Sequence, residues 1–505
     1  MDWFKSWRPA VHNALKEPIV LKTQKNNMAF RTQFLLILSG LLLFGSCSKK
    51  LYPDRSQFLK DGDPVPTVRL DYYKSVQERP GQDSSLAVAL AISGGGSRAA
   101  NFGIGVMLGL EQLHMRGEQE QDMLDQVDYL STVSGGGFAG GAYITALYEH
   151  RYFNRQEPFQ LSNYIQRQIR KDLAVSYTGV LLRAAINPRL WFSYADDGDA
   201  LERAIDEHVL GFDRRQKKDG PRTRSLLLRD IFVPAGSTGQ VYFPMHITNS
   251  STLSTMTIFP FTPDILARYQ INGYTHRLHM VKRDSLDPFQ VPLAVGIKAS
   301  GSFPVLISNS TLRSSFSPDR PYLHLIDGAM TENIGYYTAV EILKQERNRR
   351  RKVLLVVDAD AGGNLYTFSK HEAAEFSLGV LGRLPSSGLY ARRATLAKDI
   401  RSVCQQYGII PVFFSFNILL QDNDAPIPEG FEIKVEQERL IGLLKQKLEL
   451  SNSDQQVLYE VLTHIGTKYT ITNDEQELLL LSGQLIVQMQ EKELRKAMQL
   501  GREQE

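Results

Sequence analysis

Two buried-strand patterns in this chain each run straight into a glycine-rich turn and then into a helix pattern. Residues 86–92 are apolar and are followed by Ser93-Gly94-Gly95-Gly96-Ser97-Arg98, ahead of the helix pattern of residues 104–113. Residues 126–133 lead in the same way into Ser134-Gly135-Gly136-Gly137. A strand that passes directly into a helix is the repeating unit of a parallel sheet covered by helices. The chain is therefore predicted to adopt an α/β fold.

Ser134 stands at the second of these turns. A serine on a sharp strand-to-helix turn projects its hydroxyl away from the backbone. The helix N-terminus behind it directs unpaired N–H groups toward that oxygen, which favours a nucleophile whose attack creates an oxyanion. The turn by itself also fits a simple serine N-cap, and Thr132 stands where the usual nucleophile turn has a glycine.

Two other segments fit the same chemistry. Gly94, Gly95 and Gly96 leave successive backbone N–H groups bare of side chains, which makes a cradle for an anion. Asp327 ends another apolar strand and is followed by Gly328. An Asp-Gly pair ordinarily marks only a turn, so it indicates a catalytic carboxylate only in combination with the other two segments.

These three segments, in this order, resemble the patatin-like phospholipase family over roughly residues 86–420. Residues 298–304, and the strand pair of residues 248–251 and 259–262, resemble further parts of that family. The resemblance implies a three-layer α/β/α fold with a mostly parallel central sheet. It implies no metal and no organic cofactor.

The resemblance also implies roles for single residues. Ser134 corresponds to the nucleophile and Asp327 to its base, in a dyad that needs no histidine, while the loop Gly94 to Gly96 corresponds to the oxyanion hole. A serine hydroxyl is a poor nucleophile until an adjacent base accepts its proton. Arg98 corresponds to a residue that supports the loop or a phosphate, with loop support the better interpretation, and Asn333 to one that orders the segment after Asp327.

None of the ten histidines lies in a motif that resembles the histidine of a catalytic triad. His324 is nearest to Asp327 along the chain, but three positions earlier on a strand it points to the opposite face. The glycine loop also fits a permissive dinucleotide-binding pattern. That pattern requires an acidic residue at the end of the next strand, where this chain has Ser134.

Composition excludes several classes of function. A net charge of +3 over 505 residues is too small to indicate a nucleic-acid partner. The two cysteines, Cys47 and Cys404, rule out a disulfide framework and make a zinc site implausible. Cys404 lies in a helix pattern and is predicted to be a buried apolar residue.

Cys47 has a different context. An apolar stretch over residues 34–44 is too short to span a bilayer but has the length of a signal-peptide core, and Gly45-Ser46-Cys47 follows it. The segment resembles a bacterial lipoprotein signal, which implies a chain lipidated at Cys47 and anchored in the cell envelope. Met28 would then be an alternative start, and an uncleaved transmembrane anchor is the alternative to lipidation.

The remaining chain divides by composition. Residues 1–47 are the N-terminal extension and signal, and the polar, proline-bearing residues 48–85 are predicted to be a tether. Residues 86–420 form the catalytic domain, with a cap-like insertion at about residues 150–235. Residues 421–505 form a helical C-terminal region. Helices are predicted over residues 162–184, 199–210, 435–450, 453–465 and 473–500, the last beginning at the N-cap Asn473.

Together these features predict a membrane-tethered serine acyl hydrolase, a phospholipase or lipid esterase whose partners are a lipid ester and a membrane. Acyl transfer to an acceptor other than water would use the same serine and is the first alternative. The second is a non-catalytic envelope lipoprotein that retains the fold.

Overall fold

A computed structural model describes residues 67–115, 121–153, 158–165, 169–185, 197–211, 225–276, 279–280, 286–304, 306–347, 349, 351–359, 396–420 and 454–499. All of them belong to one compact unit that begins at Pro64. In these ranges no helix is long and apolar enough to cross a bilayer. Residues 1–66, which include the predicted signal and Cys47, lie outside the described residues.

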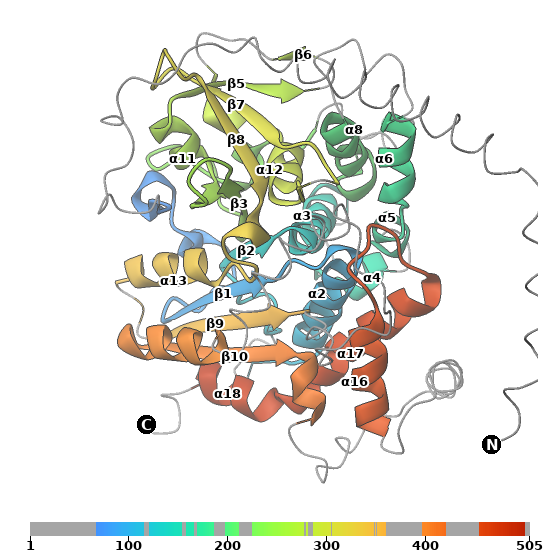
Figure 1. Ribbon diagram of the computed structural model, residues 1–505. Coiled ribbons are helices and arrows are strands. Elements are labelled where there is room, and N and C mark those ends of the chain that lie inside the picture. Colours follow the sequence, from blue (N-terminus) through green and yellow to red (C-terminus); the bar gives the residue numbers. More distant parts are fainter. Residues whose placement is uncertain are drawn as a thin grey trace, which may run out of the picture. The chain divides into compact units, whose positions relative to one another are not determined.

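Strands and helices alternate through the first part of this unit (Figure 1). The strands are β1 (Leu86–Ile92), β2 (Tyr129–Val133), β3 (Met245–Thr252), β4 (Ile258–Phe261), β5 (Ile271–His276), β6 (His279–Met280), β7 (Ser310–Ser314), β8 (Tyr322–Asp327), β9 (Arg351–Asp358) and β10 (Ile409–Ser415). The α-helices are α2 (Gly96–Glu111), α3 (Gly135–Phe153), α4 (Ser162–Tyr164), α5 (Arg170–Leu173), α6 (Tyr177–Ala185), α8 (Asp197–Ala204), α10 (Leu228–Ile231), α11 (Pro263–Arg268), α12 (Leu293–Ser300), α13 (Tyr336–Gln345), α16 (Asp454–His464), α17 (Asn473–Met489) and α18 (Glu491–Gln499). Short 3-10 turns are η3 (Leu70–Tyr72), η4 (Val76–Glu78), η7 (Pro288–Gln290), η8 (Gly328–Met330) and η9 (Phe416–Leu420), and η6 (Ile205–Val209) is a π-helical turn.

The described strands form one sheet in the order β10-β9-β1-β2-β3-β8-β7-β5-β6, with β4 paired to β3. From β10 to β3 every pair is parallel, and from β3 to β6 every pair is antiparallel. Strand β1 and the middle of β9 are continuous apolar runs, because helices bury both faces of the sheet there, whereas the buried strands β2 and β3 also carry polar residues. The predicted α/β class with a parallel core is confirmed.

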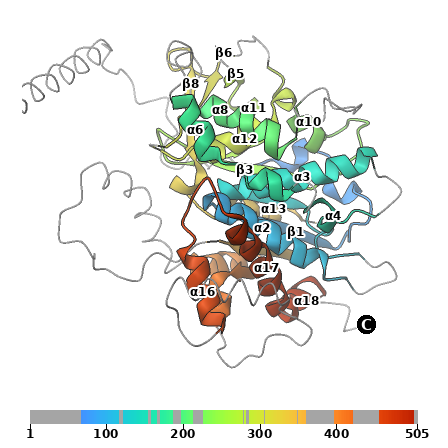
Figure 2. The same ribbon diagram turned by 90° about the vertical axis from the view of Figure 1, so that its right-hand side faces the viewer.

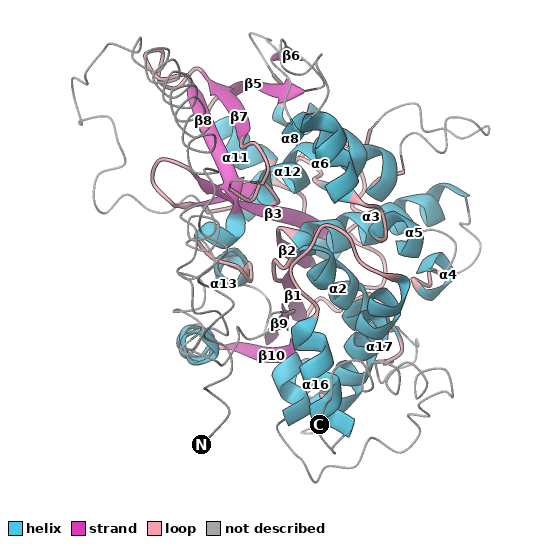
Figure 3. Cartoon of the chain, turned by 45° about the vertical axis from the view of Figure 1, so that its right-hand side comes forward, coloured by secondary structure: helices cyan, strands magenta, loops and turns pink. Residues whose placement is uncertain are grey.

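Helices lie on both sides of this sheet, which gives the predicted three layers (Figure 3). On one side α2 and α3, the two helices that follow the glycine turns, pack against each other, and α12 packs against α3, β3 and β8. On the other side α13 contacts β1, β2 and β9. The helical residues 396–406 lie near α13, since the Lys344 ammonium sits 4.3 Å from the ring centre of Tyr407. Cys404 in this helix is buried, as predicted.

The C-terminal helices are part of the domain core. Helix α17 packs along α2 (Figure 2), and the side chains of Leu478, Leu479, Leu480, Leu485 and Ile486 are buried as its sequence predicts, while Leu481 is half-buried. The two backbones approach so closely that a side chain at Gly483 would meet Gly105 at 2.5 Å. Thr472, rather than the predicted Asn473, caps α17, because its hydroxyl accepts from the Glu475 N–H in a capping box. A break at Gln490 divides the predicted single helix into α17 and α18.

The insertion between β2 and β3 differs in detail from its sequence pattern. The single helix predicted over residues 162–184 includes α4, α5 and α6 and is interrupted at residues 174–176, between α5 and α6. The helix predicted over residues 199–210 is present as α8 followed by the π-helical turn η6. The helix predicted over residues 435–450 lies outside the described residues.

The tether predicted over residues 48–85 is wrong at its C-terminal end. Val68, Tyr73 and Val76 are buried against the domain. The Tyr73 hydroxyl donates to the carboxylate of Asp264, 2.6 Å away and 191 residues further along the chain. The burial of these three side chains and the hydrogen bonds of Tyr73 and Arg79 to the domain hold residues 67–85 on the fold.

Candidate active site

Ser134 occupies a strained turn at the carboxyl end of β2, where α3 begins. Its φ of +48° lies in the left-handed region that side chains other than glycine seldom adopt. The turn can close because glycines follow: a side chain at Gly136 would meet the carbonyl oxygen of Ile92 in β1 at 2.4 Å. The predicted sharp turn is therefore present, with the serine 7% exposed.

Asp327 reaches this turn from a distant part of the chain. Its strand β8 pairs with β3, which in turn pairs with β2. The Ser134 Oγ donates to Asp327 Oδ2 across 2.7 Å, and the Ala329 N–H donates to Oδ1 across 2.9 Å. The glycine after the aspartate is needed for packing, since a side chain at Gly328 would meet the Asn249 carbonyl oxygen at 2.1 Å.

Burial sets the proton affinity of the Asp327 carboxyl, which is 1% exposed. Loss of water raises its pKa from 3.8 to about 6, and the hydrogen bonds from Ala329 and Ser134 offset only part of that rise. The carboxyl is thus mostly ionised at neutral pH and is a stronger base than an aspartate in water. In the part of the chain that the structure describes, no histidine hydrogen-bonds to Ser134 or Asp327. His324 lies on an exposed face, 3.1 Å from the hydroxyl of Thr311.

The glycine loop changes one of the predicted assignments. The Gly94 N–H donates to the carbonyl oxygen of Asn333 across 2.8 Å, so it is not available to an oxyanion, and its assignment to the oxyanion hole is wrong. Gly94 instead allows close packing, because a side chain there would meet Asn333 Oδ1 at 2.3 Å. Gly95 and Gly96 have φ values of +140° and +61°, and no described group accepts from their N–H. The N–H groups of Gly95 and Gly96 are therefore the donors of this loop that are still available to an oxyanion.

Arg98 is buried, and it donates hydrogen bonds to backbone and side-chain oxygens of this chain. Its guanidinium donates to the carbonyl oxygens of Ala359 at 2.7 Å and Ile465 at 2.5 Å. A third, longer contact of 3.4 Å reaches Thr467 Oγ1. This geometry fits the predicted loop support, because the arginine joins the start of α2 to the sheet and to the C-terminal region.

Sequence reasoning missed the side chain that holds the nucleophile's backbone. Ser300 Oγ accepts from the Ser134 N–H at 2.9 Å and donates to the Asn249 carbonyl oxygen at 2.5 Å. The Asn249 amide donates in turn to Ser131 Oγ and to the Thr132 carbonyl oxygen, at 3.0 and 3.1 Å. The resemblance of residues 298–304 to a family segment was the available signal, although it carried no role for Ser300.

Thr132, the departure from the usual nucleophile turn, has a partner inside the sheet. Its hydroxyl lies 3.0 Å from Nε2 of the buried His246 on β3. Burial lowers the pKa of His246 to about 3, so the ring is neutral and can accept the threonine proton. The Thr132 hydroxyl is thus satisfied inside the sheet.

The space in front of the nucleophile is small. A pocket of about 10 Å³ is lined by Ser134, Gly96, Ser97, Ala100, Gly135, Phe138, Leu173, Tyr177 and Tyr469. That volume accommodates about one water molecule. Tyr469 belongs to the C-terminal region, which the sequence placed outside the catalytic domain.

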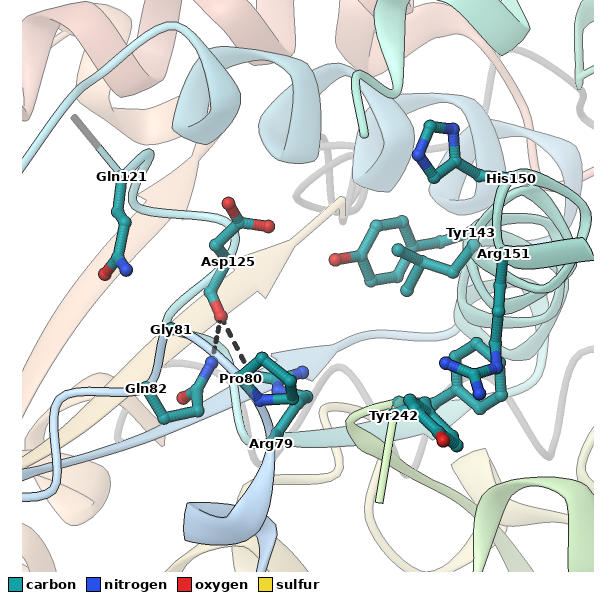
Figure 4. Close-up of a pocket in the computed structure, with 12 residues that line it drawn as sticks. Arg79, Pro80, Gly81, Gln82, Gln121, Asp125, Tyr143, His150, Arg151 and Tyr242 are labelled. Carbon is teal, nitrogen blue, oxygen red and sulfur yellow. Dashed lines mark hydrogen bonds between the residues drawn. The ribbon is translucent and has the colours of Figure 1, made fainter. Parts of the chain in front are cut away.

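A larger cavity, of about 250 Å³, lies at the opposite, amino-terminal end of the strands (Figure 4). Arg79 and Gln82 both donate to the Asp125 carbonyl oxygen at its edge, and the ring of Tyr143 forms part of its wall. It includes none of the residues predicted for the site. No described group of three or more His, Cys, Asp or Glu residues is arranged to hold a metal ion.

A comparison with protein families agrees with this geometry. The model of the family described as patatin-like phospholipase matches residues 90–340, a range that contains the glycine loop, Ser134 and Asp327. This region of the chain belongs to the patatin-like phospholipase family. Ser134 and Asp327 both lie inside the matched range, at the carboxyl ends of β2 and β8.

Solved structures give weaker likenesses. Human GIVD cytosolic phospholipase A2 is similar over 83% of this chain and 60% of its own, with 14% identity and a TM-score of 0.42. VipD from Legionella pneumophila is similar over 82% of this chain and 77% of its own, with 13% identity and a TM-score of 0.25. The patatin-like chain thus spans about three fifths of the human protein. A search of curated proteins found no match.

Proposed function

We propose that this patatin-like protein hydrolyses lipid esters with Ser134 as nucleophile and Asp327 as its general base. The observation that supports this most is the 2.7 Å hydrogen bond from Ser134 Oγ to Asp327 Oδ2, made by a serine on a strained turn. A base with a pKa of about 6 is largely ionised at pH 7 and still strong enough to take a hydroxyl proton in the transition state.

The first half of the reaction forms an acyl-enzyme. Ser134 Oγ attacks the ester carbonyl carbon as its proton passes to Asp327 Oδ2. The oxyanion then accepts hydrogen bonds from the N–H groups of Gly95 and Gly96, each worth about 3–4 kcal/mol in the transition state. When the carbon–oxygen bond to the alcohol breaks, the departing oxygen takes the proton from Asp327.

The second half restores the enzyme. Asp327 accepts a proton from water as the water oxygen attacks the acyl carbon. The tetrahedral intermediate collapses, the fatty acid leaves, and Ser134 Oγ regains its proton from Asp327. Ser300 supports both halves, because its bond to the Ser134 N–H holds the strained turn in place.

Labelling with a fluorophosphonate tests the nucleophile directly. The reagent should attach to the wild type at Ser134, located by peptide mass spectrometry, and should not attach to Ser134→Ala. Ser315→Ala, which removes an exposed serine far along the chain, is the matched control and should label normally. Attachment to any other serine, or none, would contradict the assignment. Incubation with phospholipids and neutral esters, followed by product analysis, then separates release of free fatty acid from transfer to another acceptor.

We also propose that the enzyme is tethered to a bacterial envelope membrane through a lipidated Cys47. The short apolar core of residues 34–44 and the small residues before the cysteine support this. A cysteine carrying several acyl chains would bind a bilayer far more firmly than one chain can. Mass spectrometry of the mature N-terminus tests the idea, with Cys47→Ser as the control that blocks modification. An unmodified Cys47 within an uncleaved N-terminus would refute it.

A further inference from the structure

A non-helical segment from the far C-terminal region crosses the candidate active site. Residues 465–472, here named the strap, connect α16 to α17. In Figure 2 this red segment rises from α16 toward α6 and returns to α17 beside α2. Its path brings Tyr469, which is 335 positions after the nucleophile, into the lining of the pocket that contains Ser134.

The strap is bonded on both sides of that pocket. On the side of the glycine loop, the Lys468 carbonyl oxygen accepts from the Ser97 N–H at 2.8 Å, and Arg98 binds the strap's first residue. On the side of the insertion, the Tyr177 N–H donates to the Tyr469 carbonyl oxygen at 3.1 Å. The hydroxyls of Ser176 and Thr470 also lie 3.1 Å apart. The backbone of the strap is therefore held, and Tyr469 projects from a fixed point.

The ring of Tyr469 completes an apolar wall next to the serine. Phe138 and Tyr177 stack edge to face at 5.2 Å, and both are buried, as is Leu173. Tyr469 differs from them because it is partly exposed and because, among the described residues, its hydroxyl reaches only the Gly301 carbonyl oxygen, 3.5 Å away. The Tyr469 side chain is the least restrained part of the wall.

We propose that Tyr469 closes the acyl side of the pocket and limits the length of the acyl group that reaches Ser134. This inference rests on the proposed function of Ser134. An acyl chain attached at the serine must extend along an apolar surface, and the one that borders the serine is formed by Phe138, Leu173, Tyr177 and Tyr469. The remaining space of about 10 Å³ holds one water molecule but no alkyl chain. Longer acyl groups require the space that the Tyr469 ring fills.

Hydrolysis of p-nitrophenyl esters from acetate to decanoate tests this. Tyr469→Ala should raise kcat/KM for octanoate and decanoate, relative to acetate, by about tenfold or more, since an apolar pocket that gains room gains binding for each added methylene. Tyr469→Phe should keep the wild-type profile, because it keeps the ring. Tyr407→Ala removes an exposed tyrosine elsewhere and is the matched control, which should also keep it.

A second variant protects the test against a folding defect. Tyr469→Leu keeps apolar packing while reducing volume, and it should shift the profile in the same direction by a smaller factor. Labelling rates with short and long alkyl fluorophosphonates should follow the same order. If wild-type enzyme hydrolyses acetate but the Ala and Leu variants keep its chain-length profile, the inference is overturned. If the wild type neither hydrolyses acetate nor labels at Ser134, the proposed function is wrong instead.

Discussion

Two carboxylates are buried in the same sheet, at opposite ends of its strands, and only one belongs to the candidate site. Asp327 is at the carboxyl end of the strands and Asp128 precedes β2 at the amino end. Both are at most 1% exposed, and burial raises the pKa of each to about 6. A raised pKa thus does not by itself identify a catalytic carboxylate.

The hydrogen-bond and ion-pair partners of Asp128 and Asp327 distinguish the two carboxylates. Asp128 accepts from the buried guanidinium of Arg349 and from the Val88 N–H, and its surroundings are sealed by packing. Among the described residues no cation lies against Asp327; it accepts from a backbone N–H and from a serine hydroxyl on a strained turn. The charge of Asp128 is compensated, so removing Arg349 would leave a buried carboxylate without a cation, whereas the Asp327 carboxylate beside a hydroxyl is able to take a proton.

Replacing the members of the dyad should have the largest effect. Ser134→Ala and Asp327→Asn should each lower kcat for ester hydrolysis by about 10⁴-fold or more, and the double variant should lose little beyond either. Steady-state kinetics measure this, and circular dichroism checks that the fold is intact. Additive losses, or substantial activity in Asp327→Asn, would show that the two residues do not act as a unit.

Breaking the ion pair of Arg349 and Asp128, at the amino end of the strands, should lower stability rather than activity. Arg349→Met leaves the Asp128 carboxylate buried without its cation and should lower the free energy of unfolding by about 3–5 kcal/mol. Denaturant unfolding measures this. Lys344→Met, which removes a partly exposed partner of Glu341, should cost less than about 1 kcal/mol. The kcat per folded Arg349→Met molecule should be unchanged; a loss there would contradict the separation of roles.

Two glycines with positive φ offer a matched comparison of the two ends. Gly95→Ala, at φ +140°, should lower kcat by about 10²–10³-fold, because the strained loop withdraws an N–H aimed at the oxyanion. Gly81→Ala, at φ +83° beside the larger cavity, also strains the backbone and should cost stability without changing kcat. Weaker substrate binding with unchanged kcat in Gly95→Ala would point to a loop that binds phosphate.

The ionisation of Asp327 should make kcat/KM depend on pH, and near neutral pH this is the smallest of the expected effects on activity. As the base it must be ionised, so kcat/KM should fall tenfold per pH unit below about pH 6 and level off above. Its folded pKa lies above the unfolded value of 3.8, so the folded state binds the proton more tightly, and stability from this group is lost as pH rises from about 4 to 6.

The variant Asp327→Asn has no carboxyl to ionise, so it does not lose stability from this group as the pH rises. At pH 8 it should be more stable than the wild type by up to about 3 kcal/mol, with little difference at pH 4. Thermal unfolding across this range measures the difference. An Asp327→Asn variant that is no more stable than the wild type at pH 8 would contradict the raised pKa of this carboxyl.

Patterns among residues close in sequence were enough to predict several strands, turns and helices. The apolar run of residues 86–92 and the glycines after it specify a buried strand, a tight turn and a helix, because each depends on neighbours in sequence. The turn at Ser134 and the Asp-Gly step at Asp327 were identified for the same reason. The apolar face of α17 was also correctly expected to dock. The prediction of a tether was wrong for residues 67–85, because Val68, Tyr73 and Val76 are too widely spaced to form a periodic apolar pattern.

Tertiary structure alone decided which of these pieces meet. Ser134 and Asp327 are 193 residues apart and touch because β3 lies between their strands. The Gly94 N–H is lost to the oxyanion because the Asn333 carbonyl lies against it, and Tyr469 reaches the pocket because α17 packs on α2. Such contacts join segments hundreds of residues apart, so no local pattern records them. The sequence determined the elements and the reacting groups, while the packing of distant backbones determined which donors stay free and what space a substrate has.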